Sequence, residues 1–95
     1  MNKFYIKNEN REFIEVEGYE LKNKYNFDLF YHKSVLGNWK ITHRPTGIGL
    51  DGTLTSQKEN LINKLDELVN KNGLKNIIKM FDYAISEEGF VPNYK

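Results

Sequence analysis

Two histidines are the residues of this sequence best suited to acid–base or metal chemistry. His32 and His43 each lie in a stretch that alternates apolar and polar residues, as strands do. If those strands pair as a hairpin, the two imidazoles come close together, and Asp28 shares the face of His32. Such a set can bind a metal ion or transfer a proton. Neither histidine has a metal-ligand spacing such as His-Glu-x-x-His, so we expect no metal site and no catalytic residue.

A second candidate is the glycine pattern at residues 47–52, which has the form Gly-x-Gly-x-x-Gly of a phosphate-binding loop. A dinucleotide-binding loop of this kind follows a buried parallel strand and opens a helix at once. Here Ile48 and Leu50 continue a strand alternation, and helical spacing starts later. We therefore predict a hairpin with turns at Gly47 and Gly52, and no cofactor.

The hydroxyl side chains do not suggest a nucleophile. Thr42 and Thr46 have no evident base partner and no nucleophile-elbow pattern. Ser56 begins the capping-box pattern Ser-Gln-Lys-Glu, in which the serine and Glu59 satisfy each other's backbone amides. We expect Ser56 to cap a helix, with Thr55 as the competing cap.

The elements that position these residues are predicted from their hydrophobic periodicity. Strand alternation covers the first half of the chain and suggests a meander of four or five antiparallel strands ending near Leu50 or Leu54. The expected strands are Lys3–Lys7, Glu12–Glu17, Phe27–Lys33, Trp39–His43 and a stretch around Ile48–Leu50, with a loop over Gly18–Asn26.

Helical spacing takes over in the second half. Asn72-Gly73 is a stop signal between two helical stripes, and Gly89 with Pro92 ends the second. We predict an α+β fold in which two C-terminal helices pack on one face of the sheet. The predicted helical core is Leu61, Leu65, Leu68, Ile77, Ile78, Phe81 and Ile85. The expected organisation is a single domain over 1–95, with strands in 1–54, helices in 56–88 and a tail over 89–95.

Composition excludes several functional classes. The 95 residues carry a formal net charge of +1 and contain no cysteine, which excludes disulfides, a thiol nucleophile and thiolate zinc sites. No apolar run approaches the ~18 residues of a membrane-spanning helix, and the sequence opens without a signal-peptide pattern. We expect a cytoplasmic protein with no membrane partner.

The alternation within the strands predicts an outer face. If Trp39, Ile41 and His43 face the helices, the intervening residues face away from them, and that face combines aromatic and cationic groups as protein interfaces do. The residues predicted to bind a protein partner are Phe30, His32, Lys40 and Arg44.

A nucleic-acid-binding module is the alternative. Aromatic side chains on an open sheet face can stack on the bases of a single strand, and lysines beside them can contact phosphates. The side chains for such a platform are Tyr5, Tyr25, Phe30, Tyr31 and Trp39, with Lys33, Lys40 and Arg44. The near-neutral charge and the absence of an RNP-like motif make this the second choice.

The stretch Asn38–Leu50, followed by Thr53 and the helix expected at Ser56, resembles small phage or prophage proteins of low-GC Gram-positive bacteria. The resemblance covers about a third of the chain and rests on a tryptophan strand, a Thr-Gly turn and a following helix. It implies an accessory protein of a mobile element. Some proteins of this size and origin, including anti-CRISPR proteins, inhibit host defence enzymes by binding. We therefore expect a non-enzymatic inhibitor of a host or defence protein, such as a CRISPR effector.

Overall fold

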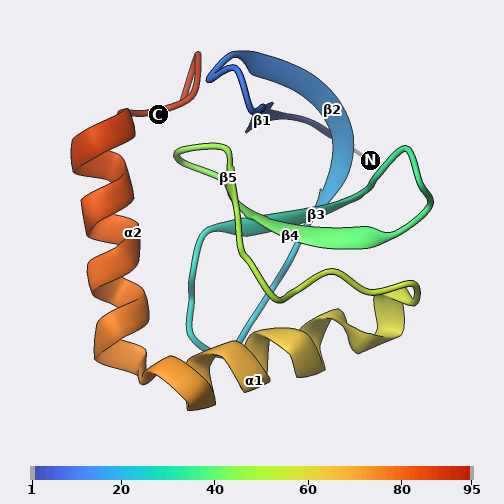
Figure 1. The fold of residues 1–95 in the computed structure, drawn as a ribbon, viewed down its shortest axis with the longest axis vertical. Coiled ribbons are helices and arrows are strands. Elements are labelled where there is room, and N and C mark those ends of the chain that lie inside the picture. The colour runs from blue at the N-terminus through green and yellow to red at the C-terminus, as the bar shows by residue number, and fades with distance from the viewer. Residues whose placement is uncertain (1, 95) are drawn as a thin grey trace.

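A computed structural model describes residues 2–94 of the protein (Figure 1). It has the predicted α+β arrangement, with an antiparallel five-stranded sheet followed by two C-terminal helices. Met1 and Lys95, the ends of the predicted domain, lie outside the described residues. The elements are β1 (Asn2–Lys7), β2 (Phe13–Glu20), β3 (Leu29–Lys33), β4 (Trp39–His43), β5 (Ile48–Gly49), the 3-10 turn η1 (Lys58–Asn60), α1 (Leu61–Asn72) and α2 (Leu74–Glu88).

The strands lie in the sheet in the order of the sequence, each antiparallel to the next. β1 and β2 form the predicted N-terminal hairpin, and β3 and β4 form a second hairpin that pairs His32 with Lys40 and Leu29 with His43. The turns at Gly47 and Gly52 have φ angles of 75° and 85°, and no helix follows them directly. The hairpin interpretation of the glycine pattern is therefore confirmed.

Strand β2 is longer than predicted. The expected loop over Gly18–Asn26 is wrong in its first part, because the strand runs on to Glu20 and pairs Tyr19 with Tyr31. Gly18 makes this crossing possible. A Cβ atom there would lie 2.7 Å from the backbone oxygen of Tyr31, closer than a side chain can approach. The missing side chain lets β2 bend across β3.

The sheet curls until its first and last parts meet. The backbone amide of Lys7 in β1 donates a hydrogen bond of 2.8 Å to the carbonyl of Gly47, in the turn before β5. A Cβ atom at Gly47 would lie 3.1 Å from the carbonyl oxygen of Tyr5. The curl leaves β3 and β4 covered on both faces, by the helices on one side and by the N-terminal hairpin on the other.

The helix-facing side holds the main core. Trp39, Ile41 and His43 point to this side as predicted, with Ile41 fully buried and the His43 ring stacked on Phe81 of α2. Alternation in β4 therefore gives the correct face. The core cluster consists of Leu21, Leu29, Ile41, Leu50, Leu61, Leu65, Val69 and Ile77.

The predicted helical core is only partly correct. Leu61, Leu65 and Ile77 are buried, and Leu68, Phe81 and Ile85 are half-buried. Ile78 remains 43% exposed, so its assignment to the core is wrong. The chain turns sharply at Gly73, and α2 stands at the side of the molecule (Figure 1). The residues of α2 that are buried or half-buried lie along one stripe of the helix.

The first helix also begins later than predicted. Ser56 is exposed and makes no capping hydrogen bond, so the predicted serine cap is wrong. The chain is still extended there, because Thr55 and Trp39 pair through backbone hydrogen bonds of 2.6 and 2.9 Å. The Thr55 hydroxyl accepts a hydrogen bond of 3.3 Å from the Gln57 amide, and α1 starts at Leu61 after the 3-10 turn.

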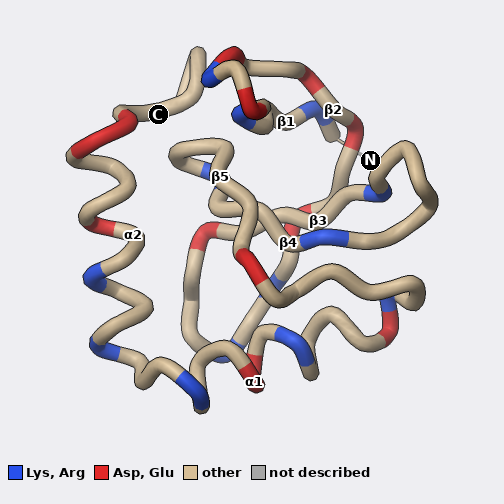
Figure 2. The backbone as a smooth tube through the Cα atoms, viewed as in Figure 1, with Lys and Arg blue, Asp and Glu red and all other residues tan. Residues whose placement is uncertain are grey.

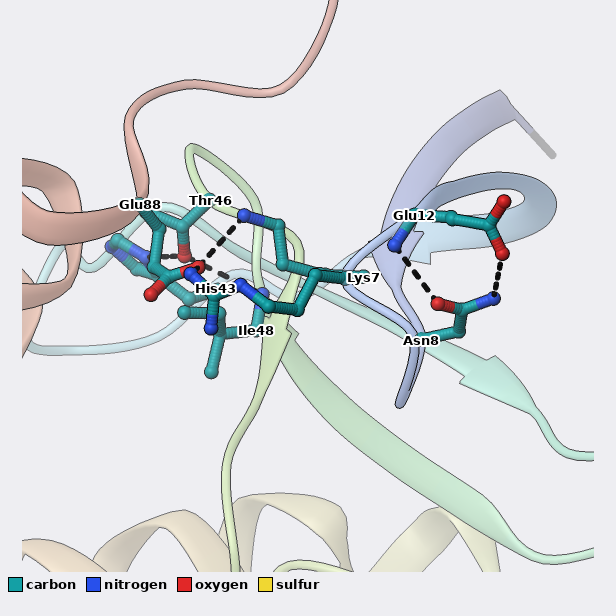
Figure 3. A network of polar contacts seen from close by, with 8 residues as sticks. Lys7, Asn8, Glu12, His43, Thr46, Ile48 and Glu88 are labelled. Atoms are coloured by element: carbon teal, nitrogen blue, oxygen red, sulfur yellow. Dashed lines mark hydrogen bonds and ion pairs between the residues drawn. The ribbon is translucent and has the colours of Figure 1, made fainter.

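The C-terminal end returns to the sheet. The amide of Val91 donates a 2.7 Å hydrogen bond to the carbonyl of Pro45. At the end of α2, Glu88 accepts hydrogen bonds from Lys7 at 2.9 Å (Figure 3) and from Arg11 at 2.5 Å. These hydrogen bonds lower the pKa of Glu88. Among residues 2–94, no helix combines the length and apolar character needed to span a membrane.

Candidate binding surfaces

Two of the four predicted partner-binding residues are not on the surface. Phe30 is fully buried, and His32 is 8% exposed, so the expected outer face is wrong for both. Phe30 stacks on Phe4 of β1, with ring centroids 4.3 Å apart and 5° between the planes. The curl of the sheet brings the N-terminal hairpin over this face and makes it a second, smaller core.

The two histidines lie on opposite faces of the β3–β4 hairpin. Burial, helped by the charge of Lys40, lowers the pKa of His32, and its Nδ1 has no hydrogen-bond partner among residues 2–94. Within the same residues, no group of three or more histidine, aspartate or glutamate side chains could hold a metal ion. The pairing of β3 with β4 therefore does not bring the two imidazoles together, and His32, His43 and Asp28 form no common site.

Lys40 and Arg44 reach the surface but have structural contacts. The Lys40 side chain extends over Gly49, where a Cβ atom would lie 2.5 Å from it. The Arg44 guanidinium lies 3.6 Å from Asp28, and it is 5.6 Å from the centroid of the Phe4 ring and 5.9 Å from that of Tyr94. Arg44 therefore helps to hold the C-terminal segment on the sheet. A role for either residue in binding stays a prediction.

Asp28 and Tyr94 complete this attachment. The Tyr94 hydroxyl donates a hydrogen bond of 2.5 Å to the Asp28 carboxylate. Burial and this hydrogen bond raise the pKa of Tyr94 to about 12. The phenol therefore stays protonated as a donor at every physiological pH.

The most exposed apolar residues lie at the turn between β3 and β4. Val35 is 103% exposed and Leu36 is 86% exposed. The turn is well defined: the Gly37 amide donates to the Ser34 carbonyl at 2.9 Å, and the Asn38 amide donates to the Ser34 hydroxyl at 3.2 Å. The hydrogen-bonded turn thus presents two aliphatic side chains to solvent, and we call Val35 and Leu36 the hairpin tip.

A cationic aromatic surface adjoins the hairpin tip. The Nζ atoms of Lys33 and Lys58 lie 5.7 and 5.9 Å from the centroid of the half-buried Trp39 ring. Neither lysine forms an ion pair with another described residue. From residue 29 to residue 50 the chain carries basic residues and no aspartate or glutamate. Elsewhere the two signs of charge are interspersed (Figure 2).

A pocket of about 590 Å³ opens between α1, α2 and the turn that follows β5. This volume lies within the usual range for small-molecule sites, roughly 300–1,000 Å³. Its walls include Ile48, Leu50, Leu68, Met80, Phe81 and Ala84, and charged side chains of α1 stand at its rim. The pocket therefore has an apolar interior and a polar edge.

His43 and Thr46 are the buried polar residues in the pocket wall. The Nδ1 atom of His43 and the Thr46 hydroxyl lie 2.8 Å apart, and Figure 3 marks this contact between them. Burial lowers the pKa of His43 to about 4, so the imidazole is neutral at neutral pH. Its Nε2 atom has no hydrogen-bond partner among the described residues.

Sequence reasoning missed both the hairpin tip and the pocket. The hairpin tip had a readable signal, because Val35 and Leu36 are aliphatic residues inside a Ser34–Gly37 turn, where polar residues are usual. The pocket had none, because it arises from how α2 stands against β5 and α1. Comparison of the chain with protein-family models, with curated proteins and with solved structures gave no match.

Proposed function

We propose that this protein acts by binding another protein, without catalysis, and that the hairpin tip is the centre of the contact. The observation that carries the proposal is the exposure of Val35 and Leu36 on a turn fixed by its own hydrogen bonds. Burying an aliphatic side chain of this size releases roughly 1.5–3 kcal/mol. A turn held by its own hydrogen bonds also loses less conformational entropy on binding than a segment without them.

The chemistry beside the hairpin tip supports a partner with an acidic surface. Lys33 and Lys58 flank Trp39 without an acidic partner in residues 2–94, and tryptophan is a frequent anchor of interfaces. Basic groups steer an acidic partner and set the orientation of binding, whereas the aliphatic tip supplies apolar burial. A partner with an apolar hollow rimmed by aspartate or glutamate fits this combination.

The resemblance of residues 38–50 to phage and prophage proteins supports a more specific proposal. On that basis the partner is a host or defence protein, such as a CRISPR effector, and binding inhibits it. Many enzymes that act on nucleic acids recognise phosphates with basic grooves, so an acidic surface is not a general property of such a target. The proposal therefore concerns an acidic, apolar-pocketed region of the target rather than its nucleic-acid groove.

The experiment compares the wild-type protein with three variants. The wild type is used as bait in a lysate of a low-GC Gram-positive host, the captured protein is purified, and its Kd is measured by calorimetry. The double variant Val35→Ser/Leu36→Ser should weaken binding at least tenfold, about 1.4 kcal/mol. Lys33→Glu should weaken binding and reduce its dependence on salt.

The matched control is Tyr83→Ser, which removes an exposed apolar side chain from α2. It should bind within twofold of the wild type. All variants are first checked for unchanged melting temperature. If the hairpin-tip variant binds as tightly as the wild type, this surface is not the site of contact.

Nucleic-acid binding remains the second proposal, and one observation favours it. The half-buried Trp39 ring has the ammonium groups of Lys33 and Lys58 nearby, at 5.7 and 5.9 Å from its centroid, so a base that stacks on the ring would bring its phosphates close to positive charge. The ring of Phe30 is not available for a wider platform, because it is fully buried. A salt-dependent gel shift with single-stranded oligonucleotides that Trp39→Ala abolishes would favour this function.

A further inference from the structure

The pocket between α1, α2 and β5 is formed by residues other than those of the hairpin tip. Its lining suits a small molecule, whereas the hairpin tip suits a protein surface. Its interior is formed by aliphatic, thioether and aromatic side chains contributed by three separate elements. Met80 is 48% exposed at its edge, and a flexible thioether adapts to ligands of different shape. Apolar compounds gain from entering such a space, since their surface leaves water.

The side chain of His43 places a polar group in the apolar interior of the pocket. The His43 imidazole is more than nine-tenths buried, lines the pocket and has one ring nitrogen without a partner among residues 2–94. The other nitrogen is held by the Thr46 hydroxyl, which also accepts a weak hydrogen bond of 3.4 Å from the Ile48 amide. A ligand hydroxyl suits Nε2 in either tautomer, because a hydroxyl both donates and accepts.

The charges at the rim balance. Lys64 and Lys71 contribute two positive charges, and Asp51 and Glu67 contribute two negative ones. Lys64 and Glu67 lie 3.8 Å apart, which further reduces their pull on a ligand. The rim thus has no net preference for an anion or a cation, and the apolar interior disfavours both because burying an unpaired charge is costly.

From these three features we propose that the pocket binds a small uncharged compound, an aromatic alcohol, whose hydroxyl reaches Nε2 of His43 and whose ring lies among Leu50, Leu68 and Ala84. This inference is independent of the proposed protein contact. The ring occupies the apolar interior beside Phe81, and the hydroxyl satisfies the imidazole nitrogen. The compound makes no ion pair at the rim.

The test is an NMR titration of the full chain with three ligands of one ring system. 2-Naphthol carries the hydroxyl, 2-naphthoate carries a negative charge instead, and 2-methylnaphthalene has neither. We expect 2-naphthol to bind at least tenfold more tightly than 2-naphthoate and to shift the amides of Leu50, Leu68 and Ala84. Equal binding of 2-naphthoate, or shifts located outside the pocket, would overturn the proposal.

Two substitutions test the roles of the pocket residues. Ala84→Phe fills the interior and should abolish binding, with Ala84→Leu as the smaller replacement if the first variant does not fold. His43→Phe keeps a ring against Phe81 and removes the nitrogen. It should weaken 2-naphthol about fivefold or more and leave 2-methylnaphthalene unchanged. Loss of both ligands to the same extent would mean that His43 only shapes the pocket.

Discussion

The imidazole of His43 lies flat against the ring of Phe81, with centroids 4.3 Å apart and 9° between the planes. The contact joins the end of strand β4 to the middle of α2. Because α2 packs along one stripe, this stacked pair is a principal attachment of the helix to the sheet. The protonation of His43 therefore bears directly on the stability of the fold.

Stability should decrease as the pH falls from 6.5 to 4. Burial lowers the pKa of His43 from 6.5 to about 4, against a smaller opposing effect of the Asp28 charge. The folded-state pKa is below the unfolded one, so the unfolded chain takes up the proton first. At about 1.4 kcal/mol per pH unit, the loss is at most about 3 kcal/mol.

Urea unfolding at several pH values between 7.5 and 4 measures this effect. His32, whose pKa is also lowered, contributes in the same direction. His43→Phe should therefore flatten the pH dependence without removing it. A variant whose stability declines over this range as steeply as the wild type would show that His43 is not responsible.

Core truncation should distinguish the buried stripe from the exposed one. Leu65 is fully buried in α1, and Leu65→Ala should reduce the free energy of unfolding by roughly 2–5 kcal/mol. Ile78 in α2 is half-exposed, so Ile78→Ala should cost about 1 kcal/mol or less. Chemical denaturation gives both values. Equal losses of unfolding free energy in the two variants would show that Ile78 contributes to the core as much as Leu65 does.

Two glycines in the sheet should tolerate a methyl group differently. At Gly18 the added Cβ meets the backbone oxygen of Tyr31 at 2.7 Å, and Gly18→Ala should destabilise the fold by roughly 1–3 kcal/mol. At Gly49 the nearest atoms belong to the flexible end of Lys40, which can move away. Thermal unfolding of Gly49→Ala should consequently show the smaller loss.

The ion pairs at the end of α2 should differ in their contribution. Lys7 is nearly buried, whereas Arg11 is largely exposed, and both contact Glu88. Lys7→Gln leaves the Glu88 carboxylate without its less exposed counter-charge and should lower the melting temperature more than Arg11→Gln does. Added salt should weaken the effect of Arg11→Gln more than that of Lys7→Gln. The reverse order would make Arg11 the main partner.

Some features of the fold depend only on the pattern of neighbouring residues, and these could be predicted from the sequence. Alternation in β4 correctly predicts that Trp39, Ile41 and His43 face the helices. The prediction holds because the apolar residues of α1 cover that side of the strand. Helix content and the break at Gly73 also follow from local signals. These predictions need only the period of the element and its stop residues.

The binding surface was not predictable in the same way. Alternation tells which residues share a face, and it does not tell whether a second layer covers that face. The alternation predicts that Phe30 faces solvent, because no local signal indicates that Phe4 stacks on it once the sheet has curled. Similarly, the capping box at Ser56 is a valid local signal, but the pairing of Thr55 with Trp39 holds the chain extended and delays the helix.

The return of the C-terminal segment to the sheet has a consequence for the order of folding. Residues 88–94 contact Lys7, Asp28 and Pro45, which are made much earlier during synthesis. The N-terminal hairpin can form locally, but these last contacts close long loops and must await the end of α2. On the ribosome, the first strands therefore remain without their final cover until the last residues emerge.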